Sequence, residues 1–297
     1  MNVLSNESHE TLTAPESTGV PAARAALRRR RILINSLRIL LLIVIIGGWQ
    51  LFTSWKLPGA STPVIDPFFW GQPSGILQQI VTWVTEGTAQ GPLWEQIAVT
   101  LEEAILGFVI GVVFGVICGV VLGRNRFLAD VLGIYIKAAN SIPRVVLGPI
   151  FVIGLGLGIQ SKVALAAVLV FFIVFFNAFQ GVREVDRNLM ANARILGASQ
   201  RQLSTSVVIP SALSWIFASL HTSFSFALVG AVVGEFLGST QGIGLMIQNA
   251  GATFNANGVF AAMFILAVVA LLSESLITAL ENRLIRWRPN TVSDVTI

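Results

Sequence analysis

The sequence is poor in the residues that build redox, metal and catalytic sites. It has one cysteine, two histidines and one tyrosine in 297 residues, and only 11% of its residues are charged. The lone Cys118 excludes an intrachain disulfide and a cysteine-rich metal site, and it gives no indication of a redox compartment. His9 lies in a polar N-terminal stretch and His221 in an apolar run, so we expect His221 to make a polar contact in the core rather than to bind a metal.

Two chemical patterns are also missing. The chain lacks the G-x-x-x-x-G-K-[ST] loop that cradles phosphates, so we expect no ATP site of its own and no cofactor. It shows no nucleophile with a partner base, which argues against a membrane enzyme. The net charge of +4 comes from basic residues that lie between apolar runs without alternating aromatics, so we expect no nucleic-acid partner.

Apolar residues dominate what is present. The hydrophobic fraction is 54% and the mean hydropathy is +0.78, values typical of a membrane protein with several spans. We therefore predict an all-α integral membrane protein with about six transmembrane helices. The apolar runs are residues 33–52, 103–122, 145–159, 163–179, 213–233 and 259–280.

Basic residues predict the topology. Arginines fill alternate connections and both ends of the chain, whereas the other connections hold only Lys56 and Lys162. An even number of spans with both termini in the cytoplasm satisfies this asymmetry. We expect a disordered basic tail at 1–31, a first transmembrane helix at 32–54, an outer segment at 55–92, a permease-like core at 93–284 and a cytoplasmic tail at 285–297.

Two segments depart from simple spans. Residues 127–158 carry Lys137 and Arg144 and are interrupted by Pro143 and Pro149, so we expect an interfacial piece that leads into a short or broken span. In the outer segment, Ser74 is expected to cap an amphipathic helix that lies on membrane lipid or on neighbouring spans. Its apolar residues are Ile76, Leu77, Ile80, Val81 and Val84.

The polar segment 184–210 predicts a helical hairpin between two apolar spans. Asp186 suits an N-cap for a helix over 187–196, and Gly197 supplies the left-handed residue that ends it. Ser199 and Gln202 form a capping-box pattern for a second helix that runs to Ile209. The hairpin is either a docking element for another protein or a link whose arginines only fix topology.

Glu235 and the glycines around it form the last candidate region. In the predicted topology Glu235 lies on the outer side of the membrane, where it is a candidate for the substrate pathway. The glycines of 230–251 indicate either a hinge or re-entrant segment, or close helix packing with a short loop, and we favour packing. We expect a bulky residue at Gly244 to impair assembly.

The few ionisable residues near spans leave an ion-coupled secondary transporter or channel as the alternative function.

The hairpin also carries a family resemblance. Ala191-Asn192-Ala193, Gly197, Val207 and Ile209-Pro210 follow the spacing of the EAA motif of ABC importer permeases, with Ala191 in place of its glutamate and Asn192 in place of its first alanine. Residues 73–289 resemble the nitrate, sulfonate and taurine branch. The supporting patterns are Gln72-Pro73-Ser74, 101–122, Ser141-Ile142-Pro143, 154–162, Gly181-Val182-Arg183 and 281–287.

This resemblance implies a type I transmembrane domain in a bacterial inner membrane that pairs with a second permease copy around a central pathway. It implies that the hairpin is a coupling helix in a cleft of a cytoplasmic ABC ATPase, and that a periplasmic or lipid-anchored binding protein delivers a small anionic solute of the sulfonate, nitrate or taurine kind. The residues that it assigns to the ATPase contact are Ala191, Asn192, Ala193, Arg194, Gly197, Ala198 and Pro210.

Overall fold

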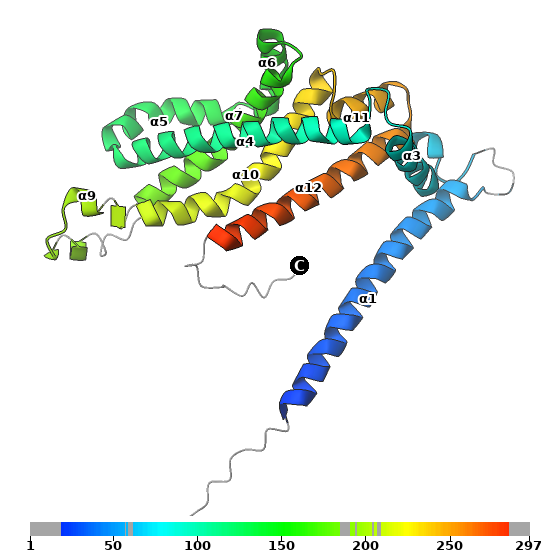
Figure 1. Cartoon of the computed structure of the whole chain (residues 1–297), viewed down its shortest axis with the longest axis horizontal. Coiled ribbons are helices and arrows are strands. Elements are labelled where there is room, and N and C mark those ends of the chain that lie inside the picture. Colours follow the sequence, from blue (N-terminus) through cyan, green and yellow to red (C-terminus); the bar gives the residue numbers. More distant parts are fainter. Residues whose placement is uncertain are drawn as a thin grey trace, which may run out of the picture. The chain divides into compact units, whose positions relative to one another are not determined.

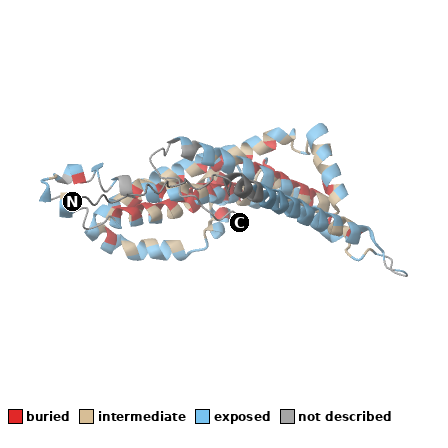
Figure 2. Ribbon diagram, turned by 90° about the horizontal axis from the view of Figure 1, so that it is seen from below, coloured by how far each residue is buried: buried red, intermediate tan, exposed pale blue. Residues whose placement is uncertain are grey.

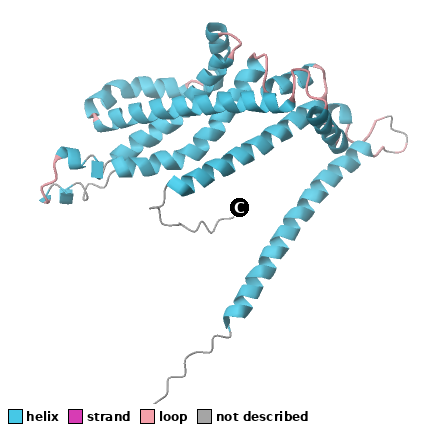
Figure 3. Ribbon diagram, in the orientation of Figure 1, coloured by secondary structure: helices cyan, strands magenta, loops and turns pink. Residues whose placement is uncertain are grey.

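A computed structural model of the chain describes residues 19–56, 58, 62–184, 191–193, 195–203, 205–206 and 209–284. The chain forms two compact units, Met1–Ile65 and Asp66–Ile297. The described residues are almost entirely helical (Figure 3), and the only β-type pairings among them are two isolated bridges. The all-α prediction is confirmed.

The first unit is dominated by one long helix, α1 (Gly19–Ser54), whose Arg28–Ser54 part is long and apolar enough to cross a membrane. The side chains of this stretch are exposed almost all round, as expected of a helix surrounded by lipid. The helix begins inside the segment that we expected to be a disordered tail at 1–31. Alanine, arginine and one leucine fill residues 22–31, and their high helix propensity accounts for the difference.

Long helices form the second unit (Figure 1), namely α4 (Leu93–Arg124), α7 (Ile159–Arg183), α10 (Ile209–Leu237) and α12 (Ala256–Leu284). Each contains a stretch able to cross a membrane, so with α1 the described residues hold five such helices, or six when a bent pair is counted as one span. The buried residues gather where these helices pack together (Figure 2). The central apolar cluster includes Ala104, Val170 and Ala227 from α4, α7 and α10.

Glycines allow α4 to approach α7 closely. Gly107, Gly111, Gly115 and Gly119 recur at every fourth position on one buried face of α4. A Cβ at Gly111 would lie 2.6 Å from Val170 Cβ, and one at Gly115 would lie 2.9 Å from Val174 Cβ. Only residues without a side chain fit at these points of contact.

The third span is broken, as predicted. Helix α5 (Arg126–Ser141) ends before Pro143 and is followed by the short 3-10 helix η1 (Arg144–Leu147) and by α6 (Gly148–Leu155). The two halves of this pair are bent by 85°. The residue before a proline is driven away from the helical region, which explains why α5 ends there.

The outer segment holds two short helices, α2 (Pro67–Trp70) and α3 (Pro73–Thr85). The expectation that Ser74 caps α3 is wrong, because the cap position is Gln72 and Pro73 begins the helix, a position that proline favours. Ile80 and Trp83 pack against a core cluster. Only part of the predicted apolar stripe therefore packs on the core, because Leu77, Val81 and Val84 are exposed.

The glycine-rich connection between α10 and α12 contains a further helix, α11 (Ile243–Ala252). Close packing of the glycines is confirmed, because a Cβ at Gly230 would lie 2.6 Å from Ala166 Cα. The connection is longer than the short loop that we expected, and it contains a helix. Ile243, Gly244, Met246 and Ala250 are buried, so α11 is part of the core.

Candidate functional site

The corner of the hairpin has the geometry that its sequence predicts. Gly197 has φ +84°, a left-handed conformation that favours glycine. The Ala198 N–H donates to the Ala193 carbonyl at 3.0 Å, and the Leu196 N–H donates to the Asn192 carbonyl at 3.0 Å. These bonds close a Schellman-type helix end and confirm the predicted stop.

The predicted capping box is also present. The Ser199 N–H donates to Gln202 Oε1 at 2.8 Å, and the Gln202 N–H donates to Ser199 Oγ at 3.3 Å. The helix that follows is α9 (Gln200–Leu203). Residues 204, 207 and 208, which decide how far this helix extends toward Ile209, lie outside the described residues. Pro210 belongs to α10. Asp186, Arg194 and Val207 lie outside the described residues.

Apolar surface is exposed at this corner. Ile195 is 82% exposed and Leu196 is 86% exposed, and a Cβ at Gly197 would meet no atom within 4 Å. A shallow hollow of about 290 Å³ lies beside them. It is lined by Ala193, Leu196, Gly197, Ala198, Gln202, Leu203 and Ser206. A fixed corner with exposed apolar side chains and an adjacent hollow suits protein docking.

Glu235 lies in a buried polar cluster near the C-terminal end of α10. Its Oε1 accepts a hydrogen bond from Thr100 Oγ1 at 2.7 Å, and its Oε2 accepts one from the Gly244 N–H at 2.6 Å. The Ile243 N–H in turn donates to Thr100 Oγ1 at 3.0 Å. Glu235 is fully buried in this conformation.

Lys162 and Glu103 complete the cluster. Lys162, which we expected in an outer loop, is fully buried in the first turn of α7. Its Nζ donates to the carbonyls of Leu157 and Gly158 and is electrostatically attracted to Glu103 and Glu235. A buried ammonium requires such partners. The cluster therefore joins α4, α7, α10 and α11.

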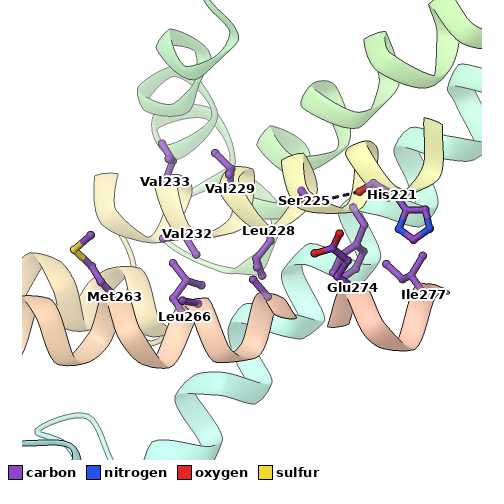
Figure 4. A pocket seen from close by; sticks show the side chains of 13 residues that line it. His221, Ser225, Leu228, Val229, Val232, Val233, Met263, Leu266, Glu274 and Ile277 are labelled. Carbon is purple, nitrogen blue, oxygen red and sulfur yellow. Dashed lines mark hydrogen bonds between the residues drawn. The ribbon is translucent and has the colours of Figure 1, made fainter. Parts of the chain in front are cut away.

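A cavity of about 400 Å³ lies between α10 and α12 (Figure 4). Its walls are mainly apolar, but His221, Ser225 and Glu274 lie toward one end, with Met263 toward the other. Ser225 Oγ donates to the His221 carbonyl at 3.3 Å. The remaining lining residues are Phe224, Leu228, Val229, Val232, Val233, Leu266, Ala267, Ala270 and Ile277.

Sequence reasoning missed this cavity. The sequence led us to expect a polar contact in the core for His221 and did not single out Glu274, but both side chains line the same cavity between spans. A usable signal was present, because His221 and Ser225 are four residues apart and so share one face of α10. Ionisable residues inside spans are themselves a signal of a functional site.

Comparison with known proteins places these features in a family. The profile of the family described as "Binding-protein-dependent transport system inner membrane component" matches residues 111–286. The chain belongs to this family and is a type I ABC importer permease, a transport subunit and not an enzyme. This membership replaces the secondary transporter or channel that we kept as the alternative.

Three relatives are similar over most of the chain. A Bacillus subtilis permease named for aliphatic sulfonate transport is 32% identical, with 84% of this chain and 87% of the relative covered. The riboflavin transport system permease of Chloroflexus aurantiacus is 37% identical, with 68% and 75% covered. The taurine transport system permease of Escherichia coli is 29% identical, with 77% and 83% covered.

Two solved structures share the fold. A chain of an amino acid ABC transporter superposes with a TM-score of 0.52 at 19% identity, covering 65% of this chain and 92% of that one. A chain of an inward-facing methionine ABC transporter superposes with a TM-score of 0.50 at 22% identity, covering 65% and 93%. These likenesses support the transmembrane architecture alone.

Proposed function

We propose that this chain is the permease subunit of an importer in a bacterial inner membrane, with both termini in the cytoplasm. In this proposal two permease copies surround the pathway, a cytoplasmic ABC ATPase binds the hairpin, and a periplasmic or lipid-anchored binding protein delivers the solute. The observation that carries the ATPase contact is the fixed corner at Gly197 with Ile195 and Leu196 exposed beside it.

The proposed contact surface is formed by the short helix before Gly197 and the residues that follow it. Exposed Asn192 and the small side chains of Ala191, Ala193 and Ala198 permit close approach of a partner's groove. Arg194 and Pro210 belong to this surface on sequence grounds. Leu196 is its apolar anchor, because an exposed leucine at a docking point is desolvated only when a partner covers it.

Co-purification of the permease with the ABC ATPase of the same importer tests this contact. We expect Leu196→Ser to lower the amount of bound ATPase and the ATP-dependent uptake, because it removes the apolar anchor. The matched control is Leu77→Ser, on α3, where the leucine is also exposed, at 63%. Full complex and full uptake in both Leu196→Ser and Gly197→Val would overturn the coupling assignment.

For the solute, we propose a small sulfonate that also carries an amine, as taurine does. The relatives named for aliphatic sulfonate and taurine transport support the sulfonate group. The carboxylate of Glu274 would repel a simple anion but attract an ammonium, whereas the His221 imidazole can donate a hydrogen bond to a sulfonate. A zwitterion therefore suits the polar end of the α10–α12 cavity better than a simple anion does.

Uptake by cells or proteoliposomes that contain the complete importer tests the solute. We expect Glu274→Gln to reduce the uptake of taurine and to leave an unsubstituted alkanesulfonate unaffected. A riboflavin-like aromatic solute is the second candidate, because the cavity walls are apolar and one relative is a riboflavin permease. Uptake of riboflavin without any uptake of sulfonates would replace the first proposal with the second.

A further inference from the structure

A second cavity lies at the other end of α7 from the buried polar cluster. It measures about 510 Å³ and opens between α5, the end of α4 and the last turns of α7. Arg183, the last residue of α7, lines it, so the cavity lies at the membrane end that leads into the hairpin. Its other lining residues are Leu122, Ala129, Asp130, Gly133, Ile134, Ile136, Lys137, Phe175, Phe176 and Phe179.

One wall of this cavity is aromatic. The rings of Phe175 and Phe179 stack with centroids 6.0 Å apart, and the rings of Phe175 and Phe176 meet edge to face at 5.2 Å. The Arg183 guanidinium lies 4.7 Å from the centroid of the Phe179 ring. This cation–π contact holds a positive charge at the edge of an apolar wall.

The facing wall adds a second positive charge. Lys137 lines the cavity from α5, and Arg183 lines it from α7. The acidic residue Asp130 also lines it, and its carboxylate lies 3.9 Å from the exposed Arg126. The cavity therefore joins an apolar, aromatic interior to two basic groups, Lys137 and Arg183, which outnumber the one acidic group among the lining residues.

We propose that this cavity binds an anionic phospholipid, with its phosphate between Lys137 and Arg183 and an acyl chain along the phenylalanine wall. Basic groups beside a cavity between membrane helices attract anionic headgroups, and apolar walls accept the chain. The surrounding face of α5 suits contact with a bilayer, because Ile134 is 71% exposed and Tyr135 is 68% exposed. The bound lipid contacts α7 next to the point where the hairpin begins.

This site is independent of the solute and of the ATPase contact. A solute that enters from the binding protein does not require it, and the Leu196→Ser test concerns a different surface. Its own test uses the purified full-length permease, in complex with its ATPase, in nanodiscs of phosphatidylcholine with a minor fraction of phosphatidylglycerol. Native mass spectrometry then measures which lipid stays bound after extraction.

We expect the wild-type protein to retain phosphatidylglycerol in preference to phosphatidylcholine. The double variant Lys137→Gln with Arg183→Gln should lose about tenfold of this preference, because two headgroup contacts are removed. The control is Arg38→Gln, which removes an exposed arginine of α1 that does not line the cavity. Equal preference in the double variant and in the control would overturn the proposal.

Further experiments distinguish a bound lipid from other occupants of the cavity, and a loss of lipid binding from a folding defect. Lys137→Arg and Arg183→Lys keep the charge, and we expect both to keep the preference. Inorganic phosphate at matched ionic strength should not displace the lipid, and displacement would mean that the site takes free anions. Efficient cross-linking between two permease copies through Ile134→Cys would mean that a second copy fills the cavity. Either of these two results would overturn the lipid assignment.

Discussion

Replacing Gly244 with alanine tests how tightly α11 is held against α10. A Cβ at Gly244 would lie 2.8 Å from Glu235 Cβ and closer still to the Val232 carbonyl oxygen, which is backbone and does not yield easily. Such overpacking costs about 1–3 kcal/mol. If α11 moves away to relieve the clash, the hydrogen bond from the Gly244 N–H to Glu235 is also lost, at about 1.5–3 kcal/mol for a charged acceptor.

The combined loss of about 2.5–6 kcal/mol corresponds to a fall of roughly 10 °C in melting temperature. Thermal unfolding of the purified permease, followed by size-exclusion chromatography, measures it. The matched control is Gly251→Ala on the same helix, where a Cβ meets no atom within 4 Å. We expect Gly244→Leu to prevent assembly altogether. If Gly244→Ala melts within a degree or two of Gly251→Ala, the tight packing described here is refuted.

Three other substitutions test separate contacts. Thr100→Val should cost about 2–5 kcal/mol in thermal unfolding, because it leaves Glu235 and a buried N–H unsatisfied, whereas Thr100→Ser should restore most of the loss. Gly111→Leu should abolish assembly of the spans as judged by size-exclusion chromatography, whereas Gly48→Leu should not, because a Cβ there meets nothing within 4 Å. Gln202→Ala should cost about 0.5–2 kcal/mol of local stability and speed amide exchange in the hairpin; unchanged exchange would contradict the capping role.

Local signals predicted local structure well. The stop at Gly197, the capping box of Ser199 and the break before Pro143 each depend on the conformational preferences of a few neighbouring residues. Such preferences act within one turn of the chain, and the structure confirms them. The wrong prediction that Ser74 caps α3 also has a local cause, because Pro73 occupies the first position of the helix and Gln72 becomes the cap.

Long-range electrostatics could not be predicted in the same way. Lys162 was assigned to an outer loop because basic residues are normally costly inside a membrane. Its actual position depends on two carboxylates from other helices, Glu103 and Glu235, whose proximity follows only from the packing of α4, α7 and α10. The cavity that contains His221 and Glu274 was missed for the same reason, since its two walls come from different spans.

The distribution of close contacts indicates which helices move together. Helix α7 ends at Arg183, just before the hairpin, and α10 begins at Ile209, just after it. These two helices are tightly joined, because a Cβ at Gly181 would lie 2.9 Å from Ala212 Cα and a Cβ at Gly230 would lie 2.6 Å from Ala166 Cα. A push on the hairpin therefore displaces α7 and α10 as one body.

Between α10 and α12, by contrast, there is a cavity of about 400 Å³ instead of glycine contacts. Packed interfaces resist deformation, whereas a cavity can open or close with little loss of contact. We therefore expect motion received at the hairpin to change the α10–α12 spacing more than the α7–α10 spacing. The polar groups that this motion would bring together or separate are His221 and Glu274, the same pair that the proposed solute contacts.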